Sequence, residues 1–251
     1  MSGEAPIAVL ASSAGGAVLV AELQRRAPHE DVVMLADNAY APYARRPGRV
    51  VVDRVGRMAT DLLAHAPKLL ILASSQGTED ALPALRARVG VPVIGLDGMV
   101  VAAAARSPGG TVAVVTGAGC RRGLQQGRSL RHERGGVAVG ASAWPGLREL
   151  ADAGRGGSPA ARELVRGQVD GLRAAGVTAL LLACPHAWAV RSAVEEAAGS
   201  DLAVVDGAAV VADRALRTLR RDGLLAHRKR AGRRILIATD PARAQRGLAV
   251  R

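Results

Sequence analysis

The chain has 251 residues, of which 49% are hydrophobic, yet it contains no Phe and only 2% aromatic residues, so its core must be built from aliphatic side chains. Its two cysteines exclude a disulfide scaffold, and the lack of a secretory signal or a transmembrane-length apolar run predicts a cytoplasmic protein without a membrane contact. The net charge of +12 fits a polyanion partner or an arginine-rich surface, but no zinc-finger or RNA-binding motif accompanies it, so nucleic acid is not expected to be the primary ligand.

Short apolar runs of strand length alternate with helical patterns along the chain. The expected strands are Ile7–Ala11, Val32–Leu35, Leu69–Ala73, Pro92–Gly95, Thr111–Val115, Val137–Gly140, Ala179–Ala183, Ala203–Asp206 and Ile235–Ala238. The clearest helical patterns are Ala17–Arg26, Arg54–His65 and Ala161–Ala175. Most of these strands are apolar throughout, which is typical of parallel sheets covered on both faces. The pattern therefore predicts an α/β fold with mostly parallel sheets flanked by helices.

An internal similarity divides the chain into two parts. Leu69–Ser74 resembles Ala179–Cys184, and each segment follows an amphipathic helix and precedes a helix and a short strand. We therefore predict two pseudo-symmetric lobes, one of residues 1–97 plus 207–251 and the other of residues 98–206. Ser74 and Cys184 would then end equivalent strands. Because ligands bind at the carboxyl ends of strands in open α/β sheets, we expect an active-site cleft between the lobes.

Six segments carry a resemblance to a known family. They are Ile7–Gly16, Asp37–Ala44, Ala73–Gln76, Ala183–His186, Asp206–Ala208 and Thr239–Pro241. They are similar, in the same order, to the Asp-Ser-Gly-x-Gly-Gly, Pro-Tyr-Gly, Ala-Cys-Asn-Thr, Gly-Cys-Thr-His, Asp-Ser-Gly-Ala and Gly-Asp-Pro segments of the aspartate/glutamate racemase superfamily, and of glutamate racemase in particular. The resemblance runs nearly from end to end, and it implies the same two-lobed fold.

The resemblance implies proton transfer without a cofactor or a metal. In the family, one thiol removes the α-proton of the substrate and a second thiol returns a proton to the opposite face, which requires groups with accessible pKa values. Cys184 keeps one of these thiols, and His186 matches the histidine that assists it. Asp152, within Leu150–Gly154, aligns with an acidic residue on the same side. Pro185 suits the first turn of a helix, whose dipole would favour a thiolate.

The other half of the family's site has changed. Ser74 stands where the second thiol is expected, and Ala11 stands where the family has the Asp that assists it. A hydroxyl has a pKa several units above that of a thiol, so ordinary two-thiol glutamate racemisation is not expected.

The resemblance also implies which residues contact the substrate. The expected substrate-binding residues are Ser12, Pro42, Tyr43, Ser75 and Gln76. Ser75 and Gln76 can hydrogen-bond a carboxylate, although Ser74 and Ser75 fit equally well as caps of the following helix. Cys120 is expected to be incidental. Trp144 and Trp188 are expected in the core, and the scattered histidines have no metal-ligand spacing.

Three hypotheses follow for the function. The first is an enzyme that isomerises, racemises or decarboxylates a small amino acid or carboxylate through the single thiol of Cys184. The second is an inactive homologue with a binding or regulatory role, for example toward DNA gyrase, with the basic stretch around Arg228–Arg230 as its surface. The third is a residual racemase in which Ser74, or a water that it holds, is the second acid–base group. The resemblance further implies a homodimer.

Overall fold

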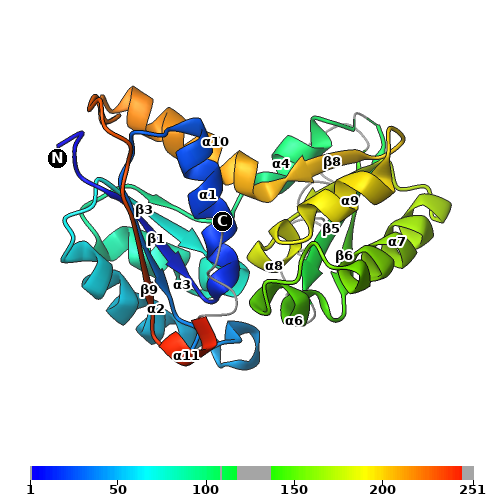
Figure 1. The fold of residues 1–251 in the computed structure, drawn as a ribbon, viewed down its shortest axis with the longest axis horizontal. Coiled ribbons are helices and arrows are strands. Elements are labelled where there is room, and N and C mark those ends of the chain that lie inside the picture. Colours follow the sequence, from blue (N-terminus) through cyan, green and yellow to red (C-terminus); the bar gives the residue numbers. More distant parts are fainter. Residues whose placement is uncertain (1, 108, 118–136, 245–251) are drawn as a thin grey trace. The chain divides into compact units, whose positions relative to one another are not determined.

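The computed structural model describes residues 2–107, 109–117 and 137–244, so Cys120 lies outside the described residues. The chain forms two compact units. One contains the residues up to Leu96 together with those from Val211 onward, and the other is Asp97–Val210. Each unit is built around its own parallel sheet, flanked by helices (Figure 1). This confirms the predicted α/β architecture.

The first unit has a five-stranded sheet in the order β4-β3-β1-β2-β9. Its strands are β1 (Ile7–Ala11), β2 (Val32–Ala36), β3 (Leu69–Ala73), β4 (Val93–Ile94) and β9 (Arg234–Ala238). Its helices are α1 (Ala17–Arg26), α2 (Gly48–Leu63), α3 (Ser75–Arg88), most of α10 (Gly207–Arg221) and α11 (Pro241–Ala244), with short 3-10 turns η1 (Ala14–Gly16) and η2 (Tyr43–Arg45). Every residue of β1, β2 and β3 is buried, as expected for strands covered on both faces.

Helices α2 and α3 cover one face of this sheet. Alternate strand residues such as Leu10 and Leu72 point into a cluster with Val55 and Leu62 of α2 and Leu82 of α3. The opposite face meets α1, which packs against β2. The core is therefore aliphatic, as the lack of Phe requires.

The second unit repeats the strand order of the first. Its strands are β5 (Thr111–Gly117), β6 (Ala138–Trp144), β7 (Ala179–Leu182) and β8 (Ala203–Asp206), in the order β6-β5-β7-β8. This matches β2-β1-β3-β4, so β3 and β7 occupy equivalent positions. The helices are α4 (Met99–Ala104), α6 (Leu147–Asp152), α7 (Pro159–Ala174), α8 (Pro185–Trp188) and α9 (Arg191–Ala198). The internal similarity of the sequence thus corresponds to a repeated strand order.

The largest difference from the sequence-based elements is the start of α2. The helix begins at Gly48 rather than Arg54, directly after Pro47, which has an extended backbone at the N-cap. Proline is tolerated at the start of a helix because the N–H groups of the first turn have no acceptor within the helix, so the N–H that proline lacks is not needed there. Glycine disfavours helix, so the local pattern hides this first part of α2.

A buried ion pair holds the amino ends of the central strands together. Lys68 and Glu30 are almost completely buried, with 2.5 Å between Nζ and Oε2. Lys68, which precedes β3, also donates a hydrogen bond to the carbonyl of Gly3, and Glu30, which precedes β2, accepts one from the N–H of Ala226. Segments from four parts of the chain are therefore joined at one edge of the sheet.

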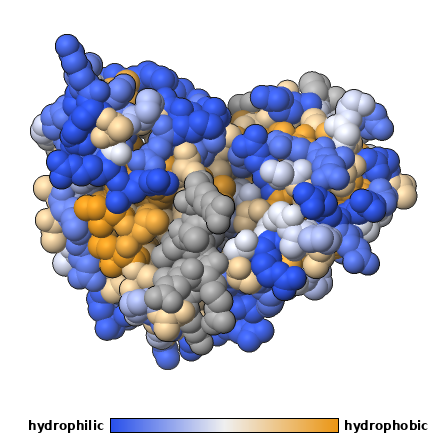
Figure 2. Space-filling view, in the orientation of Figure 1, coloured by the Kyte–Doolittle hydropathy of each residue, from blue (hydrophilic) through white to orange (hydrophobic). Residues whose placement is uncertain are grey.

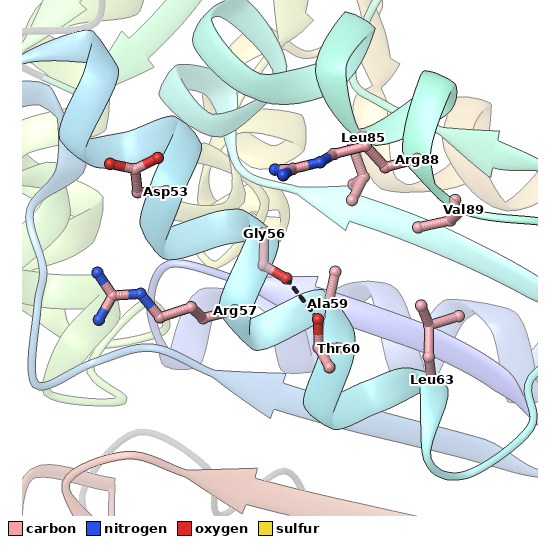
Figure 3. Close-up of a pocket in the computed structure, with 9 residues that line it drawn as sticks. All are labelled: Asp53, Gly56, Arg57, Ala59, Thr60, Leu63, Leu85, Arg88 and Val89. Carbon is pink, nitrogen blue, oxygen red and sulfur yellow. Dashed lines mark hydrogen bonds between the residues drawn. The ribbon is translucent and has the colours of Figure 1, made fainter.

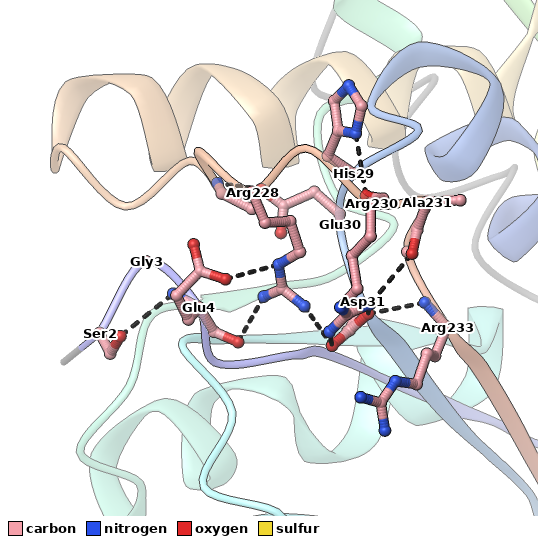
Figure 4. Close-up of polar contacts among 12 residues, drawn as sticks. Ser2, Gly3, Glu4, His29, Glu30, Asp31, Arg228, Arg230, Ala231 and Arg233 are labelled. Atoms are coloured by element: carbon pink, nitrogen blue, oxygen red, sulfur yellow. Dashed lines mark hydrogen bonds and ion pairs between the residues drawn. The ribbon is translucent and has the colours of Figure 1, made fainter.

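Arginines extend this contact to the surface, as Figure 4 shows. Arg228 pairs with both Glu4 and Asp31, and Arg230 donates two hydrogen bonds to Asp31. These hydrogen bonds, from Arg230 first, hold the pKa of Asp31 well below its ordinary value despite the opposing effect of burial. We call Glu4, Glu30, Asp31, Lys68, Arg228 and Arg230 the amino-edge cluster.

Strand β9 leaves an apolar patch on the surface of the first unit. Figure 2 shows hydrophobic surface in this region, where Ile235 and Leu236 are 48% and 37% exposed. The strand lies at the edge of the sheet and pairs only with β2 among the described residues. None of the helices in the described part of the chain is long and apolar enough to cross a bilayer.

The buried pair predicts a large loss of stability when one partner is removed. Lys68→Met leaves the Glu30 carboxylate buried without its cation, so the free energy of unfolding should fall by about 3–5 kcal/mol. The control is Glu196→Gln, which breaks the exposed Arg162–Glu196 pair and should cost less than about 1 kcal/mol. Urea unfolding compares the two, and equal losses would contradict the assigned role of the pair.

Candidate active site

The register of the first sheet gathers polar residues at its carboxyl edge. Ala11 of β1 is paired with Ala36 of β2 and with Ala73 of β3, and Ala36 is paired with Ala238 of β9. The next residue in each strand therefore lies at the same edge. These residues are Ser12, Asp37, Ser74 and Thr239.

Ser74 uses its hydroxyl as a helix cap. The residue is 1% exposed and is the N-cap of α3, where its Oγ accepts a hydrogen bond of 3.1 Å from the N–H of Gly77. Of the roles expected for Ser74, the structure therefore shows the helix cap. Ser75 begins α3, and its buried Oγ has no hydrogen-bond partner among the described residues. Gln76 donates to Asp80 over 2.8 Å, so its side chain is already oriented.

Tyr43 belongs to a buried network centred on Asp37. The Tyr43 hydroxyl donates to Asp37 over 2.7 Å, Arg54 donates two hydrogen bonds to the same carboxylate, and Thr239 donates a fourth. Burial alone would raise the pKa of Asp37, but the bonds from Arg54 and Tyr43 outweigh it and hold the pKa below its ordinary value. The same burial raises the pKa of Tyr43 far above its ordinary value.

This network changes what is expected of Tyr43. The side chain is only 2% exposed and its hydroxyl is already donated, so the phenol supports the carboxyl edge from inside the core. The Tyr43 hydroxyl is therefore already used by the protein itself. Pro42, which precedes it, is partly exposed and follows a cis peptide bond.

Ala11 lies in a tight position. Ala11 is completely buried, and a β-carbon added to Gly16 would lie 2.4 Å from the β-carbon of Ala11. Gly16 therefore has to be glycine while Ala11 stands opposite. Ser12, the next residue, is partly buried at the strand end.

Cys184 occupies the corresponding position of the second unit. It is 3% exposed and is the N-cap of α8, but its side chain makes no capping hydrogen bond, in contrast to Ser74. Helix α8 is a single turn, Pro185–Trp188. The expected help from a helix dipole is therefore small, because the dipole is a sum over aligned peptides.

The structure brings His186 and Asp152 together. His186 lies on α8 and Asp152 ends α6, and these two helices pack against each other. The distance from Nε2 of His186 to Oδ1 of Asp152 is 3.7 Å. The other ring nitrogen, Nδ1, lies close to Gly117 at the carboxyl end of β5. His186 thus lies next to Asp152, and Cys184, the N-cap of α8, precedes His186 by two residues, shortly after the end of β7.

His186 is neutral at physiological pH. Burial, as the largest cause, and the positive charge of Arg148 together lower its pKa to about 4, against the opposing effect of Glu149. The contact with Asp152 is therefore not an ion pair near pH 7. The imidazole can orient or hydrogen-bond a neighbouring group, but it is a poor proton acceptor near neutrality.

Arg54 and Arg148 were not anticipated from the sequence. Arg54 holds Asp37, and Arg148 acts electrostatically on His186. Neither lies in a motif, and arginines are too frequent in this chain for their presence alone to be informative. In the described ranges, no group of three or more His, Cys, Asp or Glu side chains is placed to hold a metal ion.

The basic stretch considered as a binding surface is largely used by the protein itself. Arg228 is only 8% exposed in its side chain and pairs with Glu4 and Asp31, and Arg230 pairs with Asp31. These charges are therefore compensated internally. Asp206, at the end of β8, likewise has a structural role, since it accepts hydrogen bonds from the N–H of Ala208 and from Arg191.

The sequence matches a known family over most of its length. Residues 8–215 match the Asp/Glu/Hydantoin racemase family. Glutamate racemase of Deinococcus radiodurans is 35% identical over 240 residues, which cover 94% of this chain and 83% of that protein. Glutamate racemase of Methylococcus capsulatus is 32% identical over 248 residues, which cover 98% of this chain and 92% of that protein.

Solved structures agree with this likeness. Glutamate racemase of Thermus thermophilus, in complex with β-chloro-D-alanine, superposes with a TM-score of 0.79 at 27% identity, covering 98% of this chain and 94% of that one. The glutamate racemase isoform RacE1 of Bacillus anthracis gives a TM-score of 0.82 at 23% identity, covering 94% and 89%. The latter identity supports the fold alone.

The low pKa of His186 predicts a loss of stability in mild acid. In the unfolded chain this histidine is protonated below its ordinary pKa of about 6.5, whereas in the folded chain it is protonated only below about pH 4. Stability should therefore fall as the pH drops below about 6.5, by about 2 kcal/mol from this residue between pH 7 and pH 5. Urea unfolding at the two pH values measures this loss.

A matched pair of variants assigns the effect. His186→Asn should remove this part of the pH dependence, whereas His227→Asn, which removes an exposed imidazole, serves as the control. In addition, the imidazole resonances of His186 should titrate near pH 4 in NMR spectra. An unchanged pH dependence in His186→Asn, or titration near pH 6.5, would contradict the buried neutral state.

Proposed function

The chain belongs to the Asp/Glu/hydantoin racemase family, and on that premise we propose that it is a cofactor-independent enzyme that transfers a proton at the α-carbon of a small amino acid or related carboxylate. The observation that carries the proposal is the position of Cys184 at the start of α8, the helix that places His186 3.7 Å from Asp152. The thiol, whose ordinary pKa is about 8.5, is suited to exchange a proton with a weak carbon acid near neutral pH, whereas burial lowers the pKa of His186 to about 4 and makes its imidazole a weak base.

The proposed proton transfer takes place on one face of the substrate α-carbon only. Cys184 as thiolate removes the α-proton and forms the thiol, and the electron pair is delocalised into the carboxylate as an enediolate. The thiol then returns a proton to the same face, so the covalent structure is restored. Exchange of the thiol proton with solvent makes this cycle visible as isotope exchange. With a malonate, which carries two carboxylates on one carbon, loss of carbon dioxide would leave an enediolate of the remaining carboxylate, which the thiol would protonate.

His186 and Asp152 are proposed as positioning residues. A neutral imidazole can hold a hydrogen bond with a neighbouring group without adding a full charge beside it. Asp152, 3.7 Å from Nε2, would fix the orientation of the ring. Arg148 supports this arrangement because its charge disfavours the imidazolium form.

The substrate class follows from the relatives and from polar groups of the first unit. The relatives are glutamate racemases, and the Thermus thermophilus protein binds β-chloro-D-alanine, which is an amino acid. Ser75, whose Oγ is without a partner among the described residues, is proposed to bind the substrate carboxylate together with Gln76 and Ser12. Ser74 is proposed to keep its capping role rather than act as an acid–base group.

Isotope exchange tests the one-thiol hypothesis. The protein is incubated in D2O with D- and L-glutamate, D- and L-aspartate and malonate, and the α-proton is followed by NMR. We expect exchange on one enantiomer only, and at least about a hundredfold slower exchange in Cys184→Ala. Cys120→Ala is the matched control and should keep the wild-type rate.

Other outcomes point to the alternatives. Full exchange in Cys184→Ala would rule out the thiol as the acid–base group, and exchange on both enantiomers would favour a residual racemase. Absence of exchange across the panel would favour an inactive homologue with a binding role. Such a role is also supported by the change of both Ser74 and Ala11 from the residues that the family has there.

Restoring the second thiol gives an independent test. Ser74→Cys restores the thiol that the resemblance to glutamate racemase implies at this position, and in that family a second thiol serves the opposite face of the α-carbon, so exchange should extend from one enantiomer to both. Losing the bond to Gly77 should cost about 1 kcal/mol of stability, which thermal unfolding can measure. The control is Ser74→Ala, which loses the cap without gaining a thiol and should leave exchange confined to one enantiomer.

A further inference from the structure

A groove lies on the first unit between α2 and α3, the two helices that cover one face of the sheet. Figure 3 shows its lining, which comes from the second half of α2 and the end of α3. The cavity has a volume of about 530 Å³, which is in the range of small-molecule sites. Its floor is apolar and consists of Ala59, Leu63, Leu85 and Val89.

Gly56 keeps this groove open. It stands in the interior of α2, where glycine is less favourable than alanine. A β-carbon at this position would lie 3.6 Å from Nη1 of Arg88, which reaches from α3 toward α2 above it (Figure 3). A longer side chain at position 56 would therefore fill space that is now open beneath the guanidinium.

Two arginines line the groove without a carboxylate partner. Arg57 on α2 and Arg88 on α3 make no hydrogen bond or ion pair with any of the described residues, and both are exposed. Asp53 is the only acidic residue in the lining. This contrasts with Arg54, Arg228 and Arg230, whose guanidinium groups are held by carboxylates. With two arginines and one aspartate, the groove lining carries a net positive charge of one above an apolar floor.

We propose that this groove binds a small anion that carries a phosphate or carboxylate group on an apolar body. The planar guanidinium group can donate two parallel hydrogen bonds to the oxygens of a carboxylate or of a phosphate. The apolar body would cover the floor, and Arg88 would hold the anionic group over Gly56, while Arg57, which extends away from α3 in Figure 3, would add positive charge at the α2 side of the groove. Because α2 carries Arg54 and α3 begins at Ser75, an occupant would contact both helices that position the carboxyl edge.

The test is direct binding to the full chain by isothermal titration calorimetry. Phenyl phosphate and benzoate are the probes, inorganic phosphate is the comparison without an apolar body, and the two probes distinguish a phosphate from a carboxylate ligand. We expect one probe to bind at least about fivefold tighter than inorganic phosphate. Arg88→Gln, Arg57→Gln and Gly56→Leu should each weaken this binding about fivefold to tenfold.

The variants are chosen to preserve the fold. Leucine is a good helix former, and a β-carbon at position 56 makes an ordinary contact, so circular dichroism of Gly56→Leu should match the wild type. Arg166→Gln removes an equal charge from an exposed site on α7 and should bind as the wild type does.

Several results would overturn the proposal. The first is that neither phenyl phosphate nor benzoate binds, and the second is that inorganic phosphate binds as tightly as they do. The third is that Arg166→Gln weakens probe binding as much as the groove variants, and the fourth is that none of the three groove variants changes the affinity. The readout is binding rather than turnover, so the result is independent of whether Cys184 carries out proton exchange.

Discussion

The in-register parallel pairing of the first sheet is the constraint on which its candidate site depends. Because Ala73, Ala11, Ala36 and Ala238 lie in one row across four strands, the residues that follow must emerge at one edge. A slip of a single residue in any strand would turn its side chains to the opposite face and bury the polar end. The small size of alanine at this row also lets η1 approach the strand ends closely, as the contact between Gly16 and Ala11 shows.

The amino ends of the same strands are fixed by charge instead of by packing. Burying Lys68 and Glu30 is costly, and the pair is tolerated because each ion has the other and a backbone partner as well. A buried pair of this kind is specific about position, since any other register would separate the two charges. Around it, arginines are paired with Glu4 and Asp31. A strongly basic composition therefore does not by itself indicate a basic binding surface.

Much of the fold could be predicted because its signals are local. Uniformly apolar runs such as Leu69–Ala73 mark strands buried on both faces, and the amphipathic pattern of Ala17–Arg26 gave α1 with its observed ends. The start of α2 was hidden because Gly48 has a poor helix propensity, and tertiary packing of Val51 and Val55 overrides that preference.

The site was less predictable because its contacts join distant segments. Asp152 and His186 lie 3.7 Å apart because α6 packs on α8, and the sequence does not show this packing. The hydrogen bond from Tyr43 to Asp37 belongs to a network with Arg54, which lies 17 residues beyond Asp37 in the chain. No spacing rule links such residues. The low pKa of His186 also follows from burial, which only the folded chain determines.

Ser74 and Cys184 show how a repeated architecture can support different chemistry in its two halves. Both follow equivalent strands and both are N-cap residues with an extended backbone. The Ser74 hydroxyl stabilises its helix by accepting the N–H of Gly77, so proton chemistry there would compete with a structural bond. The Cys184 side chain makes no such bond to its own helix, which is one turn long and needs little capping. The two equivalent N-cap positions therefore differ in the bond that the side chain makes to its own helix.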